Sequence, residues 1–329
     1  MLPRTYRFKT ATLRALSPLV LLFSANSMAQ ALDFPSRPLH FVVPYAAGGT
    51  TDQLARAIQQ PMQDFLKQPV IVENRTGAGG AIGTGAVAKS APDGYTLVFG
   101  NPGPLSIQPV LRKLAYDPLK DLRPISLVAI TPLILAVPAS SKVETLADFL
   151  KTARESGTAW NFGSVGNGSL SHLTGEYFNS LAGTQLTHIP YSGGAPMMMA
   201  FAGGQLQAAF VTGLDGQAMV QAGKARYIAV ASPSRTPVVP GLPAVAEQVP
   251  GFQSASWFGV LVPRGVPDDI SKKLHAAVAY AVAQPEVREM FLARQVEPRS
   301  SSPAELETVI RQEMSQWTAL GRKLNLHLE

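Results

Sequence analysis

Short apolar segments with the character of buried strands alternate with amphipathic segments along most of this chain, and this alternation limits the folds open to it. A first set predicts strands at 39–43, 70–73 and 96–99 and helices at 51–66 and 81–90. A second set predicts strands at 133–137, 160–162, 186–189 and 207–211 and helices at 146–154, 169–181 and 197–201. Strands that alternate with helices usually run parallel and are joined by crossover helices. We therefore predict an α/β fold.

Two such sets in 329 residues, of which 46% are apolar, indicate two lobes with separate cores. We expect each lobe to hold a mixed or parallel sheet flanked by helices. Residues 30–125 and 228–329 would form the first lobe, and residues 126–227 the second. Ligands of open α/β sheets bind outside the carboxyl ends of the strands. A binding site is therefore expected in the cleft between the lobes.

The first 29 residues have the features of a secretory signal. A basic leader precedes an apolar stretch at 15–23, and small residues follow it near Ala29 and Ala31, where cleavage is expected. The apolar stretch is shorter than the roughly 20 residues that span a membrane. We predict a signal peptide over residues 1–29 and export to the periplasm, with an uncleaved membrane anchor as the alternative.

Charge argues against nucleic acid as a partner. The leader contains Arg4, Arg7, Lys9 and Arg14, and removing these four lowers the formal net charge from +6 to +2. No cluster of Lys and Arg remains that could follow a phosphate backbone. The chain has no cysteine, so thiol nucleophiles, disulfides and thiolate metal sites are excluded.

A glycine-rich loop, "PYAAGGTTDQLAR", separates the first predicted strand from the first predicted helix. Gly48 and Gly49 can direct backbone N–H groups toward a ligand, and Thr50, Thr51 or Asp52 can cap the helix. Helix N-termini attract anions, carboxylates as well as phosphates. The alternative is a tight turn with an ordinary helix cap.

A second loop of the same kind lies in "NFGSVGNGSLSHLTGEYF". It contains Ser164, Gly166, Gly168 and Ser169 and leads into a predicted helix that carries His172. Two such loops on facing lobes would hold a small carboxylate from both sides. The alternative is that Ser169, or Ser171, acts only as a helix N-cap.

Motifs for cofactors and catalysis are missing or misplaced. Residues 83–88 match G-x-G-x-x-A, but the match lies within a predicted helix and no acid follows it at the required distance. There is no G-x-S-x-G, no phosphate-binding P-loop and no H-E-x-x-H. We predict no cofactor, no metal and no enzymatic activity. A small-ester hydrolase that pairs His172 with Ser164 or Ser169 is the alternative.

Several segments together resemble one family over essentially the whole chain after the signal. These are "FPSRPLHFVVPYAAGGTTDQLAR", "VIVENRTGAGGAIGTGAVAKSAPDGYTLVFG", "FGSVGNGSLSHLTGEYF", "HIPYSGGAP", "PGLPAVAEQVPGF", "SWFGVLVPRGVP" and "PEVREMFLARQVEP". They are similar to the extracytoplasmic solute receptors of tripartite tricarboxylate transporters, the Bug-type receptors. The resemblance implies a two-lobed periplasmic-binding-protein fold that closes on its ligand. It also implies a membrane partner with one large and one small subunit. We expect the receptor itself to be a monomer.

The resemblance places the ligand between residues 45–52 and 164–169, which agrees with the argument from the loops. Many relatives have an aspartate after the strand "LQAAF", where this chain has Val211 followed by Thr212. An acid there would suit an ammonium group and repel a second carboxylate. Its absence favours a mono- or dicarboxylate, with an aromatic one as an option because Tyr45, Tyr191 and Trp257 offer flat walls.

The predicted function is a receptor that delivers this ligand to its transporter, and a sensor for a signalling partner is the alternative. The predicted ligand-binding residues are Tyr45, Ala47, Gly48, Gly49, Thr50, Thr51, Asp52, Asn101, Ser164, Val165, Gly166, Gly168, Ser169, His172, Tyr191, Val211 and Thr212.

Overall fold

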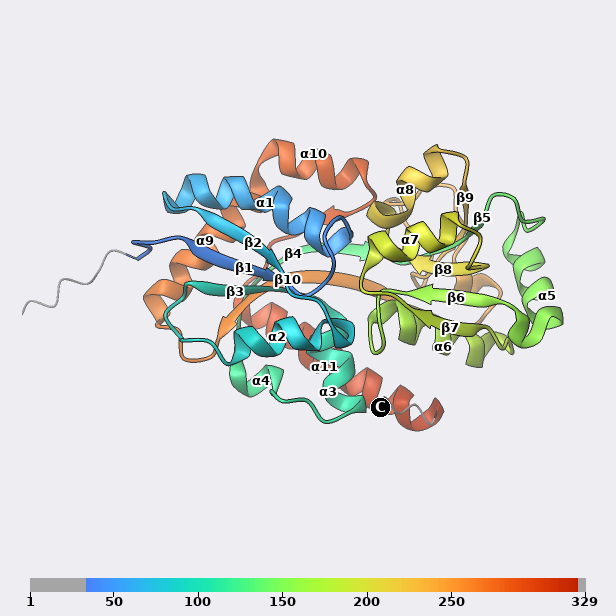
Figure 1. Cartoon of the computed structure of the whole chain (residues 1–329), viewed down its shortest axis with the longest axis horizontal. Coiled ribbons are helices and arrows are strands. Elements are labelled where there is room, and N and C mark those ends of the chain that lie inside the picture. The colour runs from blue at the N-terminus through green and yellow to red at the C-terminus, as the bar shows by residue number, and fades with distance from the viewer. Residues whose placement is uncertain (1–33, 325–329) are drawn as a thin grey trace, which may run out of the picture. The chain divides into compact units, whose positions relative to one another are not determined.

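The computed structural model describes residues 34–324, and these contain two sheets (Figure 1). The strand order is β11-β4-β10-β3-β1-β2 in the six-stranded sheet and β7-β6-β8-β5-β9 in the five-stranded sheet. Helices flank both sheets, which confirms the predicted α/β class. The predicted signal peptide over residues 1–29 and its cleavage site lie outside the described residues.

The six-stranded sheet is mixed. It consists of β1 (Leu39–Val43), β2 (Val70–Asn74), β3 (Thr96–Gly100), β4 (Leu122–Pro132), β10 (Ala255–Pro263) and β11 (Glu297–Pro298). β1 runs parallel to β2 and β3, as the alternation predicts. β10 runs antiparallel to both β3 and β4. The part of the sheet that carries the first loop is therefore the parallel part.

Helices cover both faces of this sheet (Figure 1). One face carries α1 (Thr50–Leu66), α9 (Asp268–Ala283) and α10 (Pro285–Ala293), and the other carries α2 (Ala81–Ala88) and α11 (Pro303–Leu324). Side chains alternate along β1, so Phe41 packs with Leu54 of α1 whereas Val42 packs with Val87 of α2. Because helices pack on both faces of the sheet, the end of β1 and the loop that follows it are held in a fixed position.

The five-stranded sheet consists of β5 (Ile134–Pro138), β6 (Asn161–Ser164), β7 (Thr187–Pro190), β8 (Ala208–Val211) and β9 (Ala225–Val230). β6 is parallel to β7 and β8, and β5 is antiparallel to β8 and β9. α5 (Leu146–Ser156) and α6 (Leu170–Ala182) pack on one face, where Phe162 and Phe178 are fully buried. α7 (Gly194–Ala202) and α8 (Gly213–Gln221) pack on the other.

Within the described part of the chain, two segments connect one sheet to the other. A single residue, Leu133, separates the end of β4 from the start of β5, and residues 231–254 connect β9 to β10. We call each sheet with its helices a lobe. The expected lobe boundaries at 125/126 and 227/228 stay a prediction.

Shorter elements join the main ones. They are the turns of helix Ala78–Gly80, Gly103–Ile107, Gly157–Ala159 and Val245–Glu247, together with α3 (Gln108–Leu111) and α4 (Pro118–Asp121). Among residues 34–324, no helix combines the length and the apolar character needed to cross a bilayer.

Candidate functional site

A small cavity of about 50 Å³ lies where the first turns of several helices from both lobes meet. α1 contributes from the six-stranded lobe, and α6, α7 and α8 contribute from the five-stranded lobe. The first N–H groups of a helix have no acceptor within the helix, so these ends favour an anion. The cavity is lined by Tyr45, Gly49, Thr50, Thr51, Asn101, Leu133, Val165, Leu170, Ser171, Gly194, Phe210, Thr212, Asp215, Ser256 and Phe258.

The first loop brings the start of α1 to the cavity. Gly48 has φ +82°, a conformation that favours glycine. Gly49 is the N-cap of α1 with φ −81°, and glycine has no side chain with which to cap the helix. The first-turn amides of α1 are therefore open to other acceptors.

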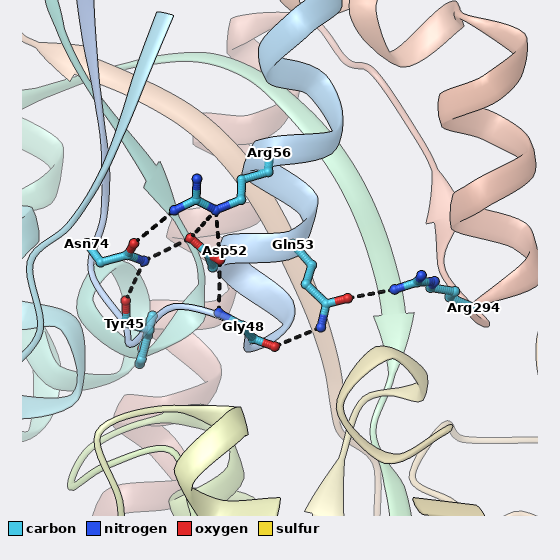
Figure 2. Close-up of polar contacts among 7 residues, drawn as sticks. All are labelled: Tyr45, Gly48, Asp52, Gln53, Arg56, Asn74 and Arg294. Carbon is cyan, nitrogen blue, oxygen red and sulfur yellow. Dashed lines mark hydrogen bonds and ion pairs between the residues drawn. The ribbon is translucent and has the colours of Figure 1, made fainter. Parts of the chain in front are cut away.

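Asp52 fixes the conformation of this loop through hydrogen bonds (Figure 2). Its carboxylate accepts hydrogen bonds from Gly48 N (2.9 Å), Asn74 Nδ2 (2.9 Å) and Arg56 Nε (2.9 Å), and it does not line the cavity. Burial raises the pKa of Asp52, but the hydrogen bonds from Arg56, Gly48 and Asn74 outweigh it and leave the pKa below its usual value. Asn74 Nδ2 also donates to Tyr45 O, which ties β2 to the same loop.

The second loop leads into α6. Ser169 is the N-cap of this helix, and its Oγ accepts from His172 N at 3.3 Å, as the simple capping alternative expects. Ser171 Oγ accepts from Val165 N at 3.1 Å, which fixes the loop against the helix start. The residues of this segment that reach the cavity are Val165, Leu170 and Ser171.

The serine and histidine groups of this loop do not form the pair that the hydrolase alternative requires. Ser164 Oγ lies 2.6 Å from Nε2 of His188, not from His172. His172 Nδ1 instead accepts from Gly168 N at 3.1 Å. Ser164 is fully buried, and neither histidine lines the cavity. Among the described residues, no group of three or more acidic or histidine side chains is placed to hold a metal ion.

The two lobes touch directly beside the cavity. Thr50 N donates to Asp215 Oδ1 at 2.9 Å, and the hydroxyls of Thr50 and Thr212 lie 2.5 Å apart. A Cβ atom placed on Gly49 would lie 3.0 Å from the backbone nitrogen of Gly194 at the start of α7. The backbones of the two lobes therefore approach closely at the cavity.

Asn101 and Tyr45 of the six-stranded lobe contribute polar side chains to the wall of the cavity. Asn101 Oδ1 accepts from Gly103 N at 3.2 Å and lies 3.1 Å from Tyr45 Oη, which also reaches Gly79 O at 2.9 Å. These contacts orient the amide of Asn101, so its NH₂ group is the part left to donate. Burial raises the pKa of Tyr45 far above its usual value, and the phenol is a neutral donor.

The predicted ligand-binding residues divide into two groups by position. Those that line the cavity are Tyr45, Gly49, Thr50, Thr51, Asn101, Val165 and Thr212. The others, which lie in the loops or behind them, are Ala47, Gly48, Asp52, Ser164, Gly166, Gly168, Ser169, His172, Tyr191 and Val211. Of these, Gly166 and Tyr191 line a neighbouring surface cavity with Tyr45 and Val165.

Several cavity residues were not among the predicted ones, and Asp215 is the most important. The sequence places no acid at Val211 or Thr212, but Asp215, four residues after Val211, lines the cavity. The available signal was "TGLD", in which Thr212 and Asp215 have the spacing of a helix cap and its N3 partner. The aromatic walls are Tyr45, Phe210 and Phe258, whereas Trp257 packs in the core beside Leu306.

The comparison with known families identifies the chain. Residues 54–326 match the model of the tripartite tricarboxylate transporter family receptor. The chain is 32% identical over 299 residues to the protein BugT of Bordetella pertussis, which covers 90% of this chain and 92% of BugT. This protein belongs to the tripartite tricarboxylate transporter receptor family, as the sequence segments predicted.

Solved structures agree with this assignment. A Rhodopseudomonas palustris protein, Rpa4515 with adipate, has a TM-score of 0.86 and 33% identity over 90% of this chain and 99% of that one. MatC from Rhodopseudomonas palustris with bound malate has a TM-score of 0.83 and 34% identity over 87% of this chain and 99% of MatC. The two-lobed periplasmic-binding-protein fold is thus established for this chain.

Proposed function

We propose that this protein is a periplasmic receptor that binds a small carboxylate between its lobes and delivers it to a membrane transporter with one large and one small subunit. The observation that carries the proposal is the composition of the cavity. Helix N-termini from both lobes surround it, and its lining by residues 34–324 includes no Lys or Arg. A carboxylate would be held by backbone amides and hydroxyls, as at other helix N-termini.

Closure follows from the same arrangement. The amides of α1 belong to one lobe and those of α6, α7 and α8 to the other, so a carboxylate that binds both sets stabilises the closed form over an open one. A cavity of about 50 Å³ is small beside ordinary ligand pockets, so entry requires the lobes to separate. Adipate and malate, bound by two relatives, support a carboxylate as the ligand class.

The direct test is a thermal-shift and calorimetric screen of mono- and dicarboxylates against the purified protein. A true ligand should raise the melting temperature in proportion to the logarithm of its concentration, with about 2.7 kcal/mol of stabilisation at 100 times Kd. The matched controls are the corresponding neutral amides, which have the same shape without the charge. The absence of both a shift and binding heat across the whole panel would contradict the proposal.

The natural ligand can be sought independently. Mass spectrometry of small molecules released from the protein purified under native conditions should show an organic acid in stoichiometric amount. A copurifying compound without a carboxylate would contradict the proposed ligand class.

A further inference from the structure

Asp215 places a negative charge in the cavity where the proposed receptor would hold a carboxylate. It lies in the first turn of α8, is largely buried, and lines the cavity. Oδ1 accepts from Thr50 N of the other lobe at 2.9 Å, and Oδ2 accepts from Thr212 Oγ1 at 3.2 Å. The N–H group of Thr50 is therefore already hydrogen-bonded to Asp215, and the ligand has to use other N–H groups.

The surroundings of Asp215 keep its carboxylate where it is. A Cβ atom on Gly194 would lie only 2.1 Å from Oδ1, so the acid packs directly against the backbone at the start of α7. Thr50 and Thr212 donate to it from two further helix starts. A ligand therefore meets Asp215 as a fixed part of the wall. The ligand's own carboxylate is left with the other helix-start amides around the cavity, among them those of Thr51, Leu170 and Ser171.

Asp215 is the one charged side chain among the described residues that line the cavity. The other polar groups are hydroxyls and the amide of Asn101. Desolvation raises the pKa of Asp215, which shows that the surroundings already disfavour its single negative charge. A second carboxylate from the far end of a ligand would add like charge to the same enclosed space. A group that donates a hydrogen bond would be attracted there instead.

We propose that Asp215 determines ligand specificity by selecting a carboxylate whose other polar end donates a hydrogen bond, an ammonium or a hydroxyl group, and by excluding a dicarboxylate of equal length. This inference rests on the proposed function and narrows its ligand class. It reverses the preference that the sequence suggested from Val211, because the acid is present on the helix rather than at the strand end.

The experiment compares matched ligands by isothermal titration calorimetry. At four carbons the series is 4-aminobutyrate, 4-hydroxybutyrate, butyrate and succinate, and at six carbons it is 6-aminohexanoate, 6-hydroxyhexanoate, hexanoate and adipate. The wild-type protein should bind a donor-ended member at least tenfold more tightly than the dicarboxylate of the same length. The ammonium and hydroxyl members show which donor is preferred.

The variant Asp215→Asn keeps the shape and an acceptor for Thr50 N but removes the charge. The preference over the dicarboxylate should fall by at least tenfold in this variant. Asp269→Asn, an exposed acid in the first turn of α9, changes the net charge equally and should keep the wild-type preference. A wild-type preference for dicarboxylates, or an Asp215→Asn preference equal to that of the wild type, would overturn the inference.

A measurement on the wild type keeps the test independent of how Asp215→Asn folds. Succinate or adipate should bind with net proton uptake near pH 7, measured in buffers of different ionisation enthalpy, because Asp215 must be neutralised beside a second carboxylate. Donor-ended ligands should bind with none. Equal proton uptake for both classes would contradict the inference alone, whereas no binding by any carboxylate would overturn the proposed function as well.

Discussion

The imidazole ring of His172 lies on that of His188 with ring centroids 3.8 Å apart and the planes inclined by 17°. Both rings sit behind the second loop, where His172 Nδ1 accepts from Gly168 N and His188 Nε2 contacts Ser164 Oγ. A ring nitrogen that accepts a backbone N–H is unprotonated. The stacked arrangement of the two rings therefore favours the neutral form of both histidines.

Acid should destabilise the protein through this stack. Burial lowers the pKa of His172 to about 4, and burial together with His172 lowers that of His188 to about 3, from 6.5. The unfolded chain takes up these protons first, at higher pH than the folded chain. The contribution of the two neutral histidines to the free energy of unfolding is therefore fully present above pH 6.5 and falls as the pH drops toward 4. Urea unfolding at several pH values should show a loss of about 2–3 kcal/mol from each of the two histidines by pH 4.

The variant His172→Phe isolates that contribution. The ring stack is kept and one titrating group is removed, so the slope of stability against pH between 6.5 and 4 should become shallower. The loss of the acceptor for Gly168 N lowers stability by about 1–3 kcal/mol at every pH, which does not change the slope. An unchanged slope would show that the stacked histidines do not titrate as expected.

Glu313 of α11 should produce a pH dependence of the opposite sign. Its carboxyl accepts from Ser106 Oγ at 2.6 Å, and burial raises its pKa to about 7 from 4.5. The folded form keeps the proton between these values while the unfolded chain loses it, so this contribution to stability is lost as the pH rises from 4.5 to 7. Glu313→Gln should remove that loss and stabilise the protein at pH 8 by on the order of 2 kcal/mol.

A matched control for Glu313→Gln is Glu289→Gln, an exposed position on α10. It should leave unfolding at pH 8 within about 0.5 kcal/mol of the wild type. Equal stability of the wild type and Glu313→Gln at pH 8 would show that Glu313 is accommodated as a charged group.

Gly49→Val should abolish carboxylate binding with little effect on folding. The φ of −81° at Gly49 is open to every residue, so backbone strain is not the cause. The added side chain would instead meet the backbone of Gly194 across the cavity, only 3.0 Å from the position of its Cβ. Affinity should fall at least tenfold, or 1.4 kcal/mol, while Gly203→Ala, at an exposed glycine with ordinary contacts, should bind normally. Unchanged affinity in Gly49→Val would mean that the first loop is misassigned.

Asp52→Ala should weaken binding indirectly, by releasing the first loop. The change leaves Gly48 N and Asn74 Nδ2 without their shared acceptor, which costs about 1–3 kcal/mol in unfolding free energy. Arg56→Ala is the comparison, because the Arg56 side chain is half-exposed and its ion pair contributes about 1 kcal/mol or less. A loss of affinity in Arg56→Ala as large as that in Asp52→Ala would contradict the role assigned to the hydrogen bonds from Gly48 and Asn74.

The sequence predicts most of the elements because their periodicity is clear, as in β1 and α1. It does not predict β4, whose segment contains Pro124 and Pro132 and reads as a break. The sheet accommodates Pro124 at a shift in register between Val260 and Leu261 of β10. It also misses α8, where Gly213 and Gly216 weaken the helical pattern.

The site could be predicted as two loops but not as a set of contacts. Helix starts and glycine turns are local signals, so the first and second loops are visible in the sequence. The meeting of Thr50 with Asp215, 165 residues apart, depends on how the lobes face each other. Phe258 is similarly hidden, because it lies within the continuous apolar and buried run of β10 and therefore has the pattern of a core residue.

Leu133 links the shape of the cavity to the movement of the lobes. It is the single residue between β4 and β5, and its side chain also lines the cavity. Any rotation of one sheet relative to the other must change backbone dihedral angles at or beside this residue. If the proposed ligand binds in this cavity, a longer acid should hold the two sheets at a wider angle, and the size of the ligand would then be readable in the outer surface of the receptor.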